Sequence, residues 1–167
     1  MIDLKTQLIM ALNERLIPLF VNRGFALISL SADERKSREI RSSFPMGRLR
    51  RTTEDGSFQI VEIQFDKYGD AKFRLNFGTI PPTGIDHPVK HVEQWEADIA
   101  YLPYSAELYS FPFFMKWFSV SRSVGDASEK VRKVVDRVVR YVPEVEAWFQ
   151  NGKAGPHVRF VGRRLGE

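Results

Sequence analysis

The chain contains no cysteine. Disulfide bonds, thiol nucleophiles and cysteine-ligated zinc are therefore excluded, and the absence fits a reducing compartment. Long apolar runs are missing as well, because polar residues such as Asp3, Asn13 and Arg15 interrupt the N-terminal segment. We therefore expect neither a signal peptide nor a membrane span, and we predict a cytoplasmic protein without a membrane partner.

Signatures of catalysis are also scarce. None of the three histidines lies beside a nucleophile motif, and the chain has no glycine-rich phosphate loop and no dinucleotide-binding fingerprint. His87 and His91 have the spacing that would present two imidazoles to one metal on a helix, but Pro88 lies between them. We therefore predict a protein without a metal site or a cofactor, and we favour a non-enzymatic one.

The chain does have enough apolar residues for one core. It has 167 residues, of which 43% are hydrophobic and 28% are charged. These values are typical of a soluble globular protein of one domain. We expect that domain to extend over residues 1–167 and to end in a basic tail at about 151–167.

Two amphipathic helices frame the chain. Apolar residues recur at helical spacing over 3–22, where Pro18 should kink the last turn and Gly24 should end the helix. A second stripe follows the capping residue Asp126 and runs through many valines, and Gly152 ends it. Pro143 either kinks this second helix or starts a new turn.

Strands are expected between the helices. Alternation and turn residues predict strands at 25–30 and 46–53, a hairpin at 58–78, and a further strand at 157–161. The charged segment 31–43 is compatible with a short helix or a long loop. The order of elements predicts an α+β fold, in which an antiparallel sheet carries the N-terminal and C-terminal helices on one face.

The hairpin at 58–78 has one apolar and one polar face. The polar face carries Glu62, Gln64, Arg74 and Asn76, because successive strand residues point to opposite sides. The apolar faces coincide only if paired residue numbers sum to an even value. With a turn at 68–70, this places Glu62 opposite Asn76 and Gln64 opposite Arg74, which are favourable pairs. The polar face is either a binding site or a plain solvated surface.

Aromatic residues concentrate between Trp95 and Phe118. Pro103 and Pro112 favour short edge strands and loops there. The aromatic side chains either fill the core or form a partner surface, for which Phe114 and Trp117 are the candidates.

Basic residues concentrate in the segment 35–51, and the net charge of the chain is +4. Arg41, Arg48, Arg50 and Arg51 could bind nucleic-acid phosphates there. The alternative is that the run is a solvated loop.

A nuclease-like pattern involves Asp55, Glu62 and Gln64. Asp55 in a turn, followed by Glu-x-Gln on a strand, resembles a degenerate D…(D/E)-x-K motif, in which two carboxylates hold magnesium. Gln64 replaces the lysine of that motif. The alternative is that Glu62 and Gln64 merely pair across the hairpin.

Several short motifs together resemble one bacterial family. They are Pro18 late in a helix, Gly24-Phe25, Gln64-Phe65, the run 73–78, and Pro143 followed by Trp148-Phe149. These motifs resemble a family of bacterial proteins catalogued as a domain of unknown function. The resemblance covers 3–80 closely and 126–160 loosely, whereas 31–51 and 95–118 depart from the pattern.

The resemblance implies a non-enzymatic role as an immunity or partner-binding protein in bacterial competition. We therefore predict a protein-binding module, with toxin immunity as its specific role and another protein as its partner. Nucleic-acid binding through 35–51 is the first alternative, and a metal-dependent nuclease is the second.

Overall fold

The structure is a computed structural model that describes residues 1–111 and 114–162. Among these residues seven strands form one antiparallel sheet in the order β1-β2-β3-β4-β7-β9, and β8 pairs with β4 beside β7. The strands of the sheet are β1 Ala26–Ile28, β2 Arg48–Thr52, β3 Phe58–Phe65, β4 Lys72–Ile80, β7 Tyr104–Leu108, β8 Phe118–Ser119 and β9 Val158–Gly162. A separate two-stranded ribbon joins β5 (Ile85–Asp86) to β6 (His91–Val92).

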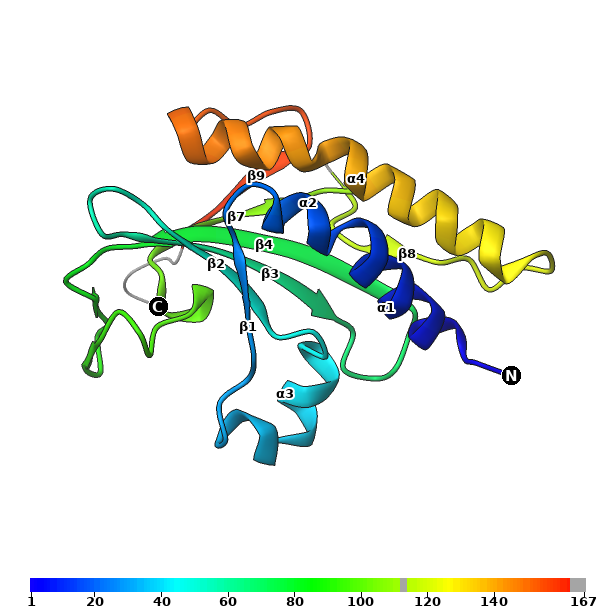
Figure 1. The fold of residues 1–167 in the computed structure, drawn as a ribbon, viewed down its shortest axis with the longest axis horizontal. Helices are drawn as coiled ribbons and strands as arrows, with labels where there is room; N and C mark the ends of the chain where they lie inside the picture. The colour runs from blue at the N-terminus through cyan, green and yellow to red at the C-terminus, as the bar shows by residue number, and fades with distance from the viewer. Residues whose placement is uncertain (112–113, 163–167) are drawn as a thin grey trace.

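The helices lie on both sides of the sheet. They are α1 Leu4–Arg15, α2 Ile17–Val21, α3 Arg38–Ser43 and α4 Ala127–Asn151, with 3-10 turns η1 Glu34–Lys36 and η2 Ile99–Tyr101. Figure 1 shows α1, α2 and α4 on one face of the sheet, and α3 on the other. The predicted α+β fold, with the N-terminal and C-terminal helices on one face, is confirmed. Along the described residues, no helix is long and apolar enough to cross a membrane.

The N-terminal helix is divided into two. The prediction of one helix over 3–22 with a kinked last turn is wrong in this respect, because α1 ends at Arg15 and α2 begins at Ile17. Pro18 has no N–H to donate to the carbonyl of Glu14, and its ring clashes with that carbonyl. The proline therefore lies in the first turn of a new helix, where its missing N–H costs nothing. Gly24 adopts a positive φ of 89°, as expected for the residue that ends this unit.

The C-terminal helix α4 is continuous through Pro143. It ends where Gly152, at φ 70°, donates its N–H to the carbonyl of Trp148 at 2.8 Å. At its start the Asp126 carboxylate accepts a hydrogen bond from the N–H of Ser128 at 2.9 Å. Of the two possibilities for Pro143, the start of a new turn is therefore wrong, because the proline lies inside one continuous helix.

The cap of α4 leads to a first prediction. Replacing Asp126 by Ala should lower the free energy of unfolding by about 1 kcal/mol, because the first turn loses a side-chain acceptor. Asp126→Asn is the matched control, since Asn is an equally good N-cap residue and should cost little. Urea denaturation of the three proteins measures the difference, and equal losses in both variants would contradict a capping role.

The main core lies between the sheet and α1, α2 and α4. Fully buried residues of the helices pack on the odd-numbered residues of β3 and β4. They include Leu8, Leu12, Leu16, Val135, Val138, Val61, Phe73, Leu75 and Phe77. Burying this apolar surface is the main favourable contribution to folding. It also determines that the even-numbered face of the hairpin points away from the main core.

A second apolar cluster covers one end of the opposite face. Ile60 and Ile80 of the hairpin pack there against residues of the segment 81–103, including Ile99 and Leu102. Gly78 makes the contact possible, because a Cβ at this position would lie 2.5 Å from Cδ1 of Leu102. The segment 99–102 therefore rests directly on the sheet and forms a wall beside the polar residues.

The C-terminal part of the sheet differs partly from expectation. The strand predicted at 157–161 is confirmed as β9, which pairs with β7 along its whole length. Because β9 covers its outer side, β7 is an interior strand, and the prediction of edge strands is wrong for this part of the aromatic segment. Pro112 and the tail residues 163–167 lie outside the described residues.

Candidate functional site

The hairpin has the predicted register. Glu62 is paired with Asn76 and Gln64 with Arg74, and the backbone N–H of Asp66 bonds the carbonyl of Lys72 at 3.1 Å. Gly69 takes the positive φ of the turn, at 94°. The even-numbered residues therefore lie on the face opposite the main core, as the sequence predicts.

This polar face is not a plain solvated surface. Glu62 retains only 4% of its exposure and Asn76 only 6%. The face forms the floor of a pocket of about 410 Å³ between Phe44, the residue that follows α3, and the segment 98–105. Its lining residues are Phe44, Arg48, Glu62, Gln64, Arg74, Asn76, Asp98, Ile99, Ala100, Leu102, Ser105, Glu107 and Val161. Five adjacent strands (β2, β3, β4, β7 and β9) thus contribute to one concave site.

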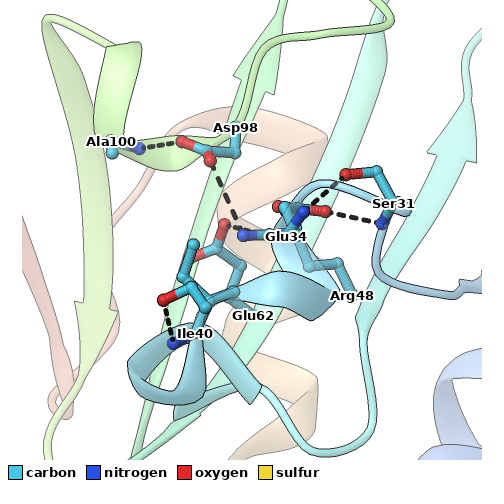
Figure 2. A network of polar contacts seen from close by, with 8 residues as sticks. Ser31, Glu34, Ile40, Arg48, Glu62, Asp98 and Ala100 are labelled. Carbon is cyan, nitrogen blue, oxygen red and sulfur yellow. Dashed lines mark hydrogen bonds and ion pairs between the residues drawn. The ribbon is translucent and has the colours of Figure 1, made fainter. Parts of the chain in front are cut away.

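Arg48 occupies the centre of one end of the pocket (Figure 2). Its Nε donates to Glu62 at 3.0 Å, one terminal nitrogen donates to Glu34 at 2.6 Å, and the other lies 3.6 Å from Asp98. We call these four residues the Arg48 cage. The ring of Phe44 lies 4.6 Å from the guanidinium, which is a favourable cation–π distance.

The carboxylates of the Arg48 cage are themselves held in place. Glu34 accepts a hydrogen bond from the N–H of Ser31 at 2.8 Å, and Asp98 accepts one from the N–H of Ala100 at 2.8 Å. Figure 2 shows that the three carboxylates come from three separate parts of the chain. The cage therefore joins β2 and β3 to both segments that border the pocket.

The electrostatics of the cage are unusual at Glu62. Burial raises the pKa of Glu62 to about 7, because Arg48 lowers it only in part and the charge of Asp98 raises it again. Burial also opposes ionisation of Glu34, but the hydrogen bonds from Ser31 and Arg48 outweigh it and lower the pKa of Glu34. Near neutral pH Glu34 is therefore ionised, while Glu62 exists in both protonation states.

A chain of amides lines the middle of the floor. The Oε1 atom of Gln64 accepts from Nε of Arg74 and from Nδ2 of Asn76, both at 2.9 Å. Arginine can only donate, so it fixes the orientation of Gln64, which in turn fixes that of Asn76. The Oδ1 atom of Asn76 is then left buried, without a hydrogen-bond partner among the described residues.

Trp117 lies beside two basic residues of β4, of which Arg74 lines the pocket. Its ring lies 5.4 Å from the guanidinium of Arg74 and 5.3 Å from Nζ of Lys72. Arg74 also lies 3.7 Å from Glu107. Phe114 is 75% exposed and stacks on Phe111 instead. Of the predicted binding residues, four line the pocket and Trp117 contacts one of them, whereas Phe114 belongs to a different surface.

The four arginines proposed for nucleic acid do not form one surface. Arg48 lies in its cage, and Arg50 stacks on the ring of Phe58 at 4.3 Å. Arg51 points to the helical face, where it bonds Glu146 at 3.0 Å and lies over Phe25. Arg41 donates to the carbonyl of Arg35. Arg48 and Arg51 are therefore held by carboxylates inside the protein, whereas Arg35, Lys36, Arg38 and Arg41 of this segment are exposed.

The nuclease-like residues are separated. Asp55 bonds Thr53 and Ser57 within the turn between β2 and β3. Glu62 lies five residues beyond Ser57 along an extended strand, which is about 16 Å. The sequence pattern therefore does not produce a shared ligand set.

The two histidines are not on a helix, in agreement with the effect expected of Pro88. His91 lies in β6 and contacts Asp86 at 2.7 Å, while the ring of His87 contacts that of Tyr101. Within residues 1–111 and 114–162, no three acidic or histidine side chains are grouped so that they could hold a metal ion.

Sequence reasoning missed three carboxylates of the site: Asp98 and Glu107, which line the pocket, and Glu34 of the Arg48 cage. Only Glu34 had a local signal, because Ser31 and Glu34 form a reciprocal capping pair typical of a helix start. Asp98 and Glu107 come from the segments that fold over the hairpin, and no spacing rule connects them to Glu62.

Comparison with known proteins gave no match, whether to a family model, to a curated protein or to a solved structure. The resemblance to the bacterial family therefore stays a prediction, and the function must be argued from the pocket itself.

Proposed function

We propose that this protein is a non-catalytic protein-binding module that receives a side chain of its partner in the pocket on the hairpin. The observation that supports it is the ordering of the floor, where Arg48, Gln64 and Arg74 are each held by at least two polar partners. A site whose groups are already fixed loses little entropy when it binds.

The same bonds favour binding over catalysis. Both arginines that line the pocket are bound to its carboxylates, and one oxygen of Glu62 is taken by Arg48. A general acid or base must instead reach a reacting group. Exposed Val161 lines the pocket and half-buried Trp117 lies beside its Arg74, and such apolar residues commonly contact a partner.

Toxin immunity rests on the family resemblance alone and stays a prediction. In that role the partner would be a toxin, and the pocket would receive one of its side chains.

The proposal is tested by capturing partners with the tagged protein, identifying them, and measuring affinity with the purified partner. Replacing Gln64 or Trp117 by Ala should weaken that affinity about tenfold or more, because each change disturbs the floor or rim of the pocket. Tyr68→Ala is the matched control for Trp117, since Tyr68 is an aromatic residue that is 84% exposed in the hairpin turn. Unchanged affinity in both pocket variants would overturn the proposal, as would the absence of any partner.

A further inference from the structure

We infer that the pocket binds a cationic group, the guanidinium or ammonium of a basic side chain, beside Glu62 and Asp98. This inference rests on the proposed function, because it names the part of the partner that the pocket receives. Three observations carry it: an imbalance of charge, an unpartnered acceptor and an apolar wall.

The imbalance of charge lies in the Arg48 cage. Glu34, Glu62 and Asp98 surround the single guanidinium of Arg48, and their side chains are between 5% and 26% exposed. When Glu62 is ionised, three carboxylates share one cation and leave negative charge where solvent screens it poorly. A second cation placed beside Glu62 and Asp98 would therefore be attracted.

The positive charge of the pocket gathers at its other end. Arg74 is bound to Gln64, lies near Glu107 and stacks on Trp117. Arg159 on β9 is paired in register with Glu107, on the side of β7 that faces away from β4. This arrangement gives the pocket a negative end and a positive end. Glu62 and Asp98 would repel an anionic ligand in the middle of the pocket, whereas they would attract a cation.

The unpartnered acceptor is Oδ1 of Asn76. Asn76 is paired with Glu62 of β3 on one side and with Glu107 of β7 on the other, so it lies between two carboxylate-bearing residues of the floor. Buried polar atoms in proteins are nearly always hydrogen-bonded, so an exception on a pocket floor points to a ligand that donates. Ammonium and guanidinium groups are donors only, and they match an acceptor together with carboxylates.

The wall of the pocket suits the stem of a basic side chain. Ile99, Leu102 and Val161 line it on the side opposite α3. Lysine and arginine place their methylene groups along apolar surfaces while the charged end reaches polar partners. A free metal ion or ammonium would use the acidic end but would leave this wall uncovered.

Binding should be coupled to the proton of Glu62. The charged groups that face Glu62 are Arg48 of β2 and Asp98 of the segment before η2, with Glu34 reached through Arg48, while β4 contributes the neutral Asn76. A cation favours the ionised carboxyl, so it lowers the pKa of Glu62 and releases its proton. Affinity should therefore rise about tenfold between pH 6 and pH 8, the range on both sides of the pKa of Glu62.

The experiment titrates the full chain with N-acetyl-arginine methylamide and follows the side-chain amide signals of Gln64 and Asn76 by NMR. The expected result is saturable binding that is about tenfold tighter at pH 8 than at pH 6. The neutral analogue N-acetyl-citrulline methylamide should not bind, because it lacks the charge. Glu62→Gln and, independently, Asp98→Asn should weaken binding, and Glu62→Gln should also remove its pH dependence.

Glu93→Gln is the matched control, since the Glu93 side chain is 51% exposed and does not line the pocket. Equal binding of the arginine and citrulline probes, equal affinity at both pH values, or tighter binding of N-acetyl-glutamate would overturn the inference. If the arginine probe fails while the Gln64 and Trp117 variants still lose a protein partner, the proposed function stands without the cation site. If both fail, the pocket is not the binding surface.

Discussion

Replacing Arg48 by Met should lower the free energy of unfolding by about 3 to 4 kcal/mol. The change removes the one cation shared by Glu34, Glu62 and Asp98, and it leaves these carboxylates together in a poorly solvated place. The loss should be larger at pH 8 than at pH 5, because burial already favours the protonated form of Glu62 at the lower pH. Urea denaturation at both pH values measures the effect.

Arg50→Met is the matched control for this prediction. Arg50 lies two residues further along β2 on the same face, where its guanidinium stacks on Phe58. Its replacement should cost less than about 1 kcal/mol, the usual range of a half-exposed cation–π contact. The double change Arg48→Met with Glu62→Leu should recover part of the stability, since an apolar pair can replace a buried ion pair at little cost. Equal losses in the two single variants would show that the Arg48 cage does not stabilise the fold.

Glu62→Gln should make the protein more stable at pH 8 while leaving it nearly unchanged at pH 4.5. In the wild-type protein the pKa of Glu62 rises from 4.5 to about 7 on folding, so the folded state holds more protons between these values. Stability therefore falls as the pH rises through this window, by about 3 kcal/mol in total. Glutamine cannot ionise, so the Glu62→Gln protein does not lose this stability as the pH rises.

The measurement compares the free energies of unfolding of wild type and Glu62→Gln from pH 4.5 to pH 8. Taking the difference cancels the titration of all other groups, and Glu93→Gln provides an exposed control. Curves that stay parallel over the whole range would show that Glu62 does not titrate in this window. A more stable variant that also binds its ligand less well would show that Glu62 is retained at the expense of stability.

The hairpin was predictable because strands repeat with a period of two. Once Phe73, Leu75 and Phe77 had to face the same side as Val61 and Ile63, only an even register remained, and it placed Glu62 opposite Asn76. The helices were predictable for a similar reason, since their apolar stripes have a clear period. Only the break at Pro18 was underestimated, because a five-residue helix is too short to show a stripe of its own.

The pocket was not predictable, because its walls come from segments without a period. The segment 31–47 reaches the hairpin through the ion pair of Glu34 with Arg48, and the segment 81–103 through Leu102 against Gly78. Each contact joins residues that are far apart in the sequence, or residue types that give no sign of a functional site by themselves. Nor does the charge of the basic run at 35–51 show which of its arginines are paired with carboxylates, as Arg48 and Arg51 are.

The two walls of the pocket are connections between consecutive elements of a sheet whose other face contains the main core. One wall connects β1 to β2, and the other connects β4 to β7. Neither wall provides most of the apolar surface against which α1 and α4 pack. Such connections tolerate insertions and exchange far better than the elements they join. The two wall segments can therefore be altered, by evolution or by grafting, so that the pocket binds a different ligand. The helices and the hairpin stay the same in such variants.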